Sequence, residues 1–98
     1  MTQQFEDTAQ AKINRGQRSR QLLDEPVLNQ ALDALLADAD RVVDNSKPGE
    51  QALREECFLA KQAIKALRKK LAGWISDGTI EQMHLDELNA KEKRNAVQ

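Results

Sequence analysis

The chain has 98 residues, of which 40% are hydrophobic, 32% charged and 3% aromatic, and its net charge is −1 with a pI near 5.8. A chain of this length has room for one small core. Its single cysteine excludes an internal disulfide framework, its start lacks the basic and apolar regions of a signal peptide, and no stretch reaches the roughly 18 apolar residues of a membrane span. We therefore expect a soluble protein that is intracellular when made.

The residue types favour helices. Tyrosine is absent, proline and glycine are scarce, and Ala, Leu, Gln, Glu, Lys and Arg are abundant. The sequence therefore predicts an all-α fold that forms one helical domain over residues 1–98, with a core over 24–77 and frayed ends at 1–7 and 90–98. Basic and acidic blocks alternate along the chain, which is expected if neighbouring helices attract each other in antiparallel pairs.

The first predicted element is an N-terminal helix over residues 8–23. Its residues are compatible with a helix, but its apolar stripe is weak and Gly16 interrupts it. The stripe consists of Ala9, Ile13, Leu22 and Leu23.

A second helix, of roughly 20 residues, is predicted to begin near Asp24. Asp24 is a candidate N-cap, and Pro26 lies near the first helical positions, where its missing N–H costs little. Apolar residues then recur at steps of 4, 3, 4 and 3, which is typical of a helix that faces a core. These residues are Leu28, Leu32, Leu35, Ala39 and Val42, with Ala31, Leu36 and Val43 beside them.

Turn-forming residues at 45–49 separate this helix from a third, predicted over 49–76. The third helix carries a heptad-spaced apolar seam over about three heptads, and Gly78, just after Asp77, is expected to cap its end. Two heptad-spaced helices joined by a short loop predict an antiparallel αα-hairpin. The seam of the third helix is Leu53, Cys57, Ala60, Ile64, Leu67, Leu71 and Trp74.

The third helix is longer than the second, so its end over residues 70–76 is predicted to lie beyond the second helix. The N-terminal helix could cover this end, as could a short C-terminal helix predicted over residues 79–88. In that case Trp74 is part of the core. Otherwise Leu71, Trp74 and Ile75 would contact a partner or another copy, since tryptophan is enriched at interface hot spots.

Catalysis and metal binding are not expected. Cys57 occupies a seam position, where cysteine behaves as a small hydrophobe, and the single histidine, His84, has no second ligand at metal-binding spacing. The chain has no glycine-rich phosphate loop and no hydrolase or zinc motif. We therefore expect no enzyme activity, no metal and no cofactor.

Two basic segments make nucleic-acid binding an alternative, because together they could follow a phosphate backbone. The acidic pI, the lack of aromatic residues in both segments and the acidic neighbouring helix favour solvated or intramolecularly paired charges instead. The first segment contains Lys12, Arg15, Arg18 and Arg20, and the second contains Lys61, Lys65, Arg68, Lys69 and Lys70.

Three features occur in order along residues 15–88: an Arg-Gly-x-x-Ser-Arg-x-Leu-Leu start, a Pro-x-Leu helix start and a long helix that closes in Asp-Gly. Together they resemble a group of small uncharacterised helical proteins of tailed bacteriophages that are encoded among head-morphogenesis genes. The residues that carry the resemblance are Arg15, Gly16, Ser19, Arg20, Leu22, Leu23, Pro26, Leu28, Asp77 and Gly78.

The resemblance implies a non-enzymatic protein that acts in phage assembly, is made in the host cytoplasm and associates with the virion. Its partners would be phage structural proteins, further copies of itself, or both, and no membrane is implied. Our hypothesis is a structural and protein-interaction protein of a phage head, with Leu71, Trp74 and Ile75 as anchors. A nucleic-acid-associated packaging or regulatory protein and a small antagonist of a host protein are the alternatives.

Overall fold

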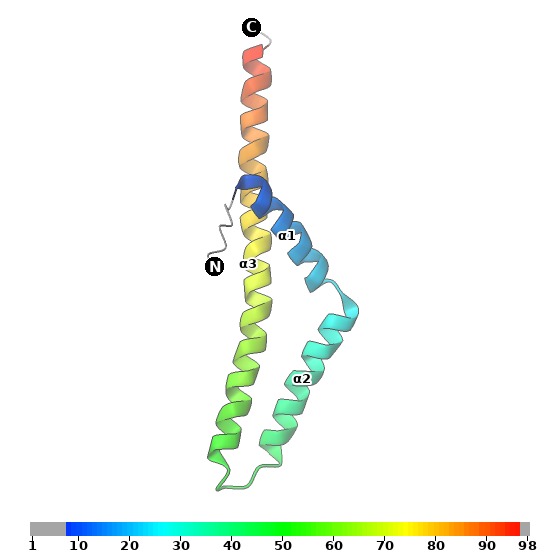
Figure 1. Cartoon of the computed structure of the whole chain (residues 1–98), viewed down its shortest axis with the longest axis vertical. Helices are drawn as coiled ribbons and strands as arrows, with labels where there is room; N and C mark the ends of the chain where they lie inside the picture. Colours follow the sequence, from blue (N-terminus) through cyan, green and yellow to red (C-terminus); the bar gives the residue numbers. More distant parts are fainter. Residues whose placement is uncertain (1–7, 97–98) are drawn as a thin grey trace, which may run out of the picture. The chain divides into compact units, whose positions relative to one another are not determined.

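The computed structural model describes residues 8–96, and three helices make up most of this part of the chain. Helix α1 spans Ala9–Leu23, α2 spans Pro26–Asp44 and α3 spans Gln51–Ala96 (Figure 1). No strand occurs between residues 8 and 96. The prediction of an all-α fold is confirmed, and the predictions for residues 1–7 and 97–98 lie outside the described residues.

Helix α3 is one continuous helix of 46 residues, which corrects two predictions. It does not end at Asp77 and Gly78, and residues 79–88 are part of it rather than a separate short helix. Gly78 lacks the positive φ of a left-handed helix cap and is buried inside the helix. The helix also continues through Ala96, so residues 90–96, which the sequence predicts to fray, are helical here.

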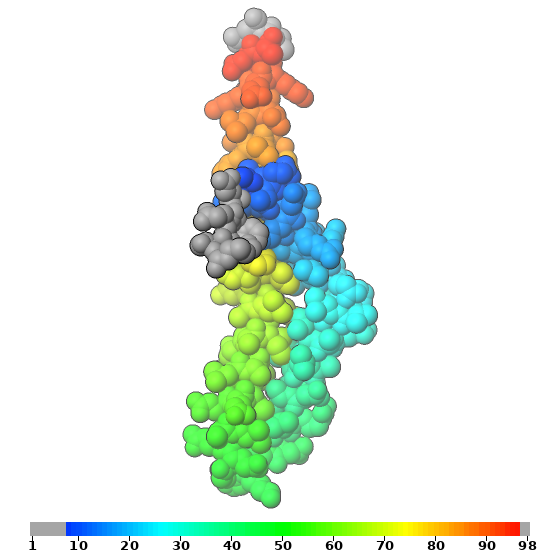
Figure 2. All heavy atoms as spheres, viewed as in Figure 1, coloured from blue at the N-terminus to red at the C-terminus, as the bar shows by residue number. Residues whose placement is uncertain are grey.

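The chain divides into two compact units. The first, called the α1 unit below, combines residues 8–21 with 71–96. The second, called the α2 unit, consists of residues 22–70, so α2 contacts the first part of α3 (Figure 2). The predicted single domain with its core over 24–77 stays a prediction.

The α1 unit is built on a close approach of two helix backbones. A Cβ atom on Gly16 would lie only 2.8 Å from the carbonyl oxygen of Trp74 and 3.2 Å from the Cα atom of Gly78. A Cβ atom on Gly78 would likewise lie 2.9 Å from the carbonyl oxygen of Lys12. Since a side chain at either position would collide with backbone, both glycines are needed for contact rather than for helix ending.

Small and apolar side chains complete the packing around these glycines. Ile13 and Leu71 are each 5% exposed, and Ser19 is 2% exposed. The Ser19 hydroxyl donates a hydrogen bond of 2.7 Å to the carbonyl oxygen of Arg15 one turn earlier, so its burial leaves no unsatisfied donor. Gly16 therefore completes the weak apolar stripe predicted for α1, because it allows α3 to come close.

Helix α2 begins with a polar cap. The Glu25 carboxylate accepts a hydrogen bond from the backbone N–H of Leu28, and Pro26 is the first helical residue. The Asn29 side chain donates to the carbonyl oxygens of Leu23 (2.6 Å) and Glu25 (2.8 Å), which ties the residues just before α2 to its first turn. The cap is thus Glu25, one residue after the candidate Asp24.

The loop between α2 and α3 is fixed by Arg54 from the first turn of α3. Its guanidinium donates to the Ser46 hydroxyl (3.1 Å) and to the carbonyl oxygens of Lys47 (2.7 Å) and Pro48 (3.2 Å). The backbone N–H of Lys47 donates to the Glu50 carboxylate at 2.8 Å. Polar contacts therefore hold the predicted turn.

The core of the α2 unit is small and follows the predicted heptad seam only in part. Leu32 and Ala39 are buried on α2, and the predicted seam residues Leu35 and Val42 are exposed. Leu36 and Val43, which were predicted to lie beside the seam, are half-buried in place of Leu35 and Val42. The half-buried residues are Leu28, Leu36 and Val43 on α2 and Leu53, Cys57 and Ile64 on α3.

Candidate interaction surfaces

The predicted anchor residues lie in the α1 unit, where α1 contacts Trp74. Leu71 is buried, and Trp74 and Ile75 are half-buried. The Arg15 guanidinium lies 5.0 Å from the centre of the Trp74 ring, which is a cation–π distance. The proximity of α1 to Trp74 matches the reading in which the N-terminal helix covers this end of α3. The role of these three residues as anchors for a partner stays a prediction.

Two residues of the first basic segment contact other residues of the α1 unit. The Lys12 ammonium lies 3.7 Å from the Glu81 carboxylate, and Arg15 stacks on Trp74. Arg18 donates a hydrogen bond to the Gln21 side chain at 3.0 Å, and both Arg18 and Arg20 are exposed. The segment therefore presents fewer solvated cations than its sequence indicates.

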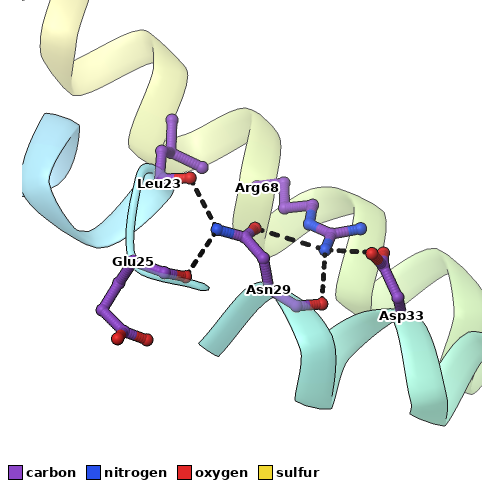
Figure 3. Close-up of polar contacts among 5 residues, drawn as sticks. All are labelled: Leu23, Glu25, Asn29, Asp33 and Arg68. Carbon is purple, nitrogen blue, oxygen red and sulfur yellow. Dashed lines mark hydrogen bonds and ion pairs between the residues drawn. The ribbon is translucent and has the colours of Figure 1, made fainter. Parts of the chain in front are cut away.

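The second basic segment contributes two ion pairs inside the α2 unit. Arg68 binds the Asp33 carboxylate at 2.8 Å, and Lys61 binds the Asp40 carboxylate. Figure 3 shows Arg68 also pointing toward Asn29, to whose carbonyl and side-chain oxygens it donates at 3.3 and 3.4 Å. Lys65, Lys69 and Lys70 are exposed. This segment is thus partly an intramolecular contact, as the alternating charge blocks indicate.

The two ion pairs occupy one edge of the helix pair. On α2, Asp33 and Asp40 each follow a buried residue, Leu32 and Ala39, by one position. On α3, Lys61 and Arg68 follow Cys57 and Ile64 by four positions. A step of one or four residues turns in the same direction around a helix of 3.6 residues per turn, so all four charges flank the buried line on the same side.

The opposite edge carries apolar side chains that no described residue buries. A step of three residues from the buried line turns the other way around the helix, and it reaches Leu35 and Val42 on α2 and Ala60 and Leu67 on α3. Leu35 is 53% exposed and Leu67 is 46% exposed. We call these four residues the open face. Because the ion pairs join the opposite edge, the open face lies on one side of both helices.

Sequence reasoning placed these residues correctly on an apolar stripe but expected them to be buried in the seam. The apolar stripe on α2 is so wide that either of two lines of residues could face α3. One runs through Leu35 and Val42, and the other runs through Leu36 and Val43. The ion pairs select the second line, because Asp33 and Asp40 must face α3. The heptad spacing of Asp33 and Asp40 was the sequence feature that could have predicted which line faces α3.

The residues singled out for chemistry in the sequence, Cys57 and His84, lie apart from any cluster of metal-binding side chains among residues 8–96. No group of three or more His, Cys, Asp or Glu side chains between residues 8 and 96 could hold a metal ion. Cys57 is a half-buried thiol in the contact between α2 and α3, and His84 is exposed. No helix in the described part of the chain is long and apolar enough to cross a membrane.

Comparison of the chain with protein-family models, with curated proteins and with solved structures finds no match.

Proposed function

We propose that the chain is a non-enzymatic protein-interaction and structural protein of a tailed-bacteriophage particle or of its assembly, associated with the head. It would be made in the host cytoplasm and carried into the virion. The assignment to phage assembly comes from the resemblance over residues 15–88. The structural feature that supports a role in protein interaction is the open face. An apolar surface that spans two helices and is left to solvent is typical of a contact site for another protein.

The open face requires a particular arrangement of α2 and the first part of α3, for which we propose the antiparallel hairpin. The order of the ion pairs supports it, since Asp33 pairs with Arg68 and Asp40 pairs with Lys61. As the residue number rises on α2, the number of the partner on α3 falls. The short loop fixed by Arg54 is compatible with the same arrangement.

A tagged pull-down from a lysate of phage-producing cells, with and without nuclease, tests this function. We expect capsid, portal or other particle proteins to be recovered in both conditions. The variant Leu35→Ser should reduce recovery because it places a polar group in the open face. Ile80→Ser is the matched control, since Ile80 is equally an exposed aliphatic residue but lies in the α1 unit.

Other results of the pull-down would contradict the proposal. Recovery of particle proteins that is lost with nuclease would favour a nucleic-acid-associated protein that binds through its exposed basic residues, among them Arg20, Lys65, Lys69 and Lys70. Recovery of one host protein alone would favour a host antagonist. Equal loss of particle proteins with Leu35→Ser and Ile80→Ser would show that the open face is not the surface that binds them.

A further inference from the structure

We propose that a second copy of this chain packs on α3 in antiparallel orientation, along a stripe whose side chains are self-complementary about Ala63. The inference rests on the proposed function, because it names one partner of the exposed apolar surface of the α2 unit. The stripe consists of Glu56, Leu59, Ala63, Leu67 and Lys70. It shares Leu67 with the open face.

The five residues form one line on α3. They follow each other at steps of 3, 4, 4 and 3 residues, so all lie on one side of the helix over about 21 Å. The order of steps reads the same in both directions. The side chains are also arranged alike from both ends. A charged residue lies at each end, with opposite signs, a leucine follows each charge, and the smallest side chain lies in the middle.

The stripe is solvent-exposed in the single chain. Leu59 is 60% exposed, Leu67 is 46% exposed, and Glu56, Ala63 and Lys70 are exposed as well. No hydrogen bond or ion pair joins the side chain of Glu56 or Lys70 to another residue between 8 and 96. The Asp33–Arg68 and Asp40–Lys61 pairs, by contrast, use other positions of the unit. The terminal charges of the stripe are therefore available to another molecule.

A two-fold axis at Ala63 brings unlike charges together. In an antiparallel pair of α3 helices, residues whose numbers are equally far above and below 63 face each other. Leu59 then packs on Leu67 of the other copy, and Glu56 lies opposite Lys70 of the other copy, twice in the dimer. The small Ala63 side chains at the axis permit the helices to approach closely.

Other occupants fit this pattern less well. A parallel, in-register pair would place Glu56 against Glu56 and Lys70 against Lys70, which repels. A two-fold dimer requires one patch to be complementary to itself, and a partner of different sequence places no such requirement on the stripe. Charge complementarity along a palindromic line therefore favours a second copy of the chain.

Sedimentation equilibrium of the purified full chain with charge-exchange variants tests the inference. The wild-type chain should form a dimer, and E56K and K70E should each weaken the dimer by roughly tenfold, since each replaces two attractive contacts by two repulsive ones. An equal mixture of E56K and K70E should associate again, because their heterodimer carries only unlike pairs. The double variant E56K/K70E should also dimerise.

The variant K65E is the matched control, since Lys65 is exposed on the same helix but lies outside the stripe. It should leave the dimer intact, and circular dichroism should give the same helix content for all variants. A wild-type chain that stays monomeric up to millimolar concentration would overturn the inference. Equal effects of K65E and K70E, or a mixture of E56K and K70E that stays monomeric, would also overturn it.

The outcome separates the inference from the function on which it rests. A monomeric chain that still recovers particle proteins through Leu35 would leave the proposed function standing and remove the second copy. A dimer with the expected charge behaviour that recovers no particle proteins would do the reverse.

Discussion

The α1 unit and the α2 unit join helices in two different ways. In the α1 unit, Gly16 and Gly78 permit contact between backbones, and the small residue Ser19 is almost fully buried. In the α2 unit, a narrow line of aliphatic residues is flanked on one side by ion pairs and on the other by exposed Leu35 and Leu67. A helix pair held by side chains on one edge leaves apolar surface on the other, where a partner can bind.

This difference between the two units indicates which surface of the chain is available to a partner. Sequence alone placed the partner anchors in the segment that contains Trp74, because that segment is predicted to lie beyond α2. The structure has α1 against this segment, and exposed Leu35 and Leu67 lie instead on one edge of the α2 unit. The heptad-spaced seam predicted on α3 is thus only partly buried within the chain.

The largest expected effect contrasts two leucines one turn apart on α3. Leu71→Ala should lower the free energy of unfolding by about 3 kcal/mol, because Leu71 is buried and its removal leaves a cavity. Leu67→Ala should cost less than about 1 kcal/mol, since Leu67 is half exposed in the single chain. Urea unfolding followed by circular dichroism, at a concentration low enough to keep copies apart, measures both. Equal losses would contradict the contrast.

The glycine contact predicts opposite signs for two identical substitutions. Gly16→Ala should destabilise the α1 unit by about 2 kcal/mol, because the new Cβ collides with backbone atoms that cannot move aside cheaply. Gly73→Ala should stabilise the chain by about 0.5–1 kcal/mol, since nothing lies within 4 Å of a Cβ there and alanine favours helix. Thermal unfolding followed by Trp74 fluorescence measures both. A stabilising Gly16→Ala would mean that the helices do not touch there.

The start of α2 predicts a smaller effect. Glu25→Ala should cost about 1 kcal/mol, because the backbone N–H of Leu28 loses its acceptor. Glu25→Gln keeps an acceptor oxygen and should cost less than half as much. Urea midpoints of the two variants decide the matter, and an equal loss for both would show that the charge of Glu25 matters rather than the hydrogen bond.

The ion-paired edge predicts the smallest effect. A double-mutant cycle on Asp33→Ala and Arg68→Ala should give a coupling of about 0.5–1 kcal/mol that decreases with salt, because Asp33 is largely exposed. The control cycle on Asp38 and Arg41, an exposed pair within α2, should give about 0.3 kcal/mol. A smaller coupling for Asp33 and Arg68 than for the control would show that this edge does not hold the helices together.

The sequence predicted the helices and loops better than the contacts between helices. Helix content, the start of α2 at Pro26 and the loop before α3 follow from local signals that act over a few residues. Gly78 was interpreted as a helix end because its use as a contact depends on Lys12 and Gly16, far away in the chain. The choice between Leu35 and Leu36 likewise depends on ion pairs between helices, which periodicity within one helix does not contain.

The proposed function and the proposed dimer both require the exposed leucines of the α2 unit to be a contact surface. Sedimentation equilibrium of the wild-type chain, Leu67→Ser and Ile80→Ser over a concentration series tests this most directly, because Leu67 and Ile80 are similarly exposed residues of α3 in different units. We predict that the wild-type chain and Ile80→Ser associate and that Leu67→Ser stays monomeric with unchanged helix content. Association of Leu67→Ser with wild-type affinity would contradict the account.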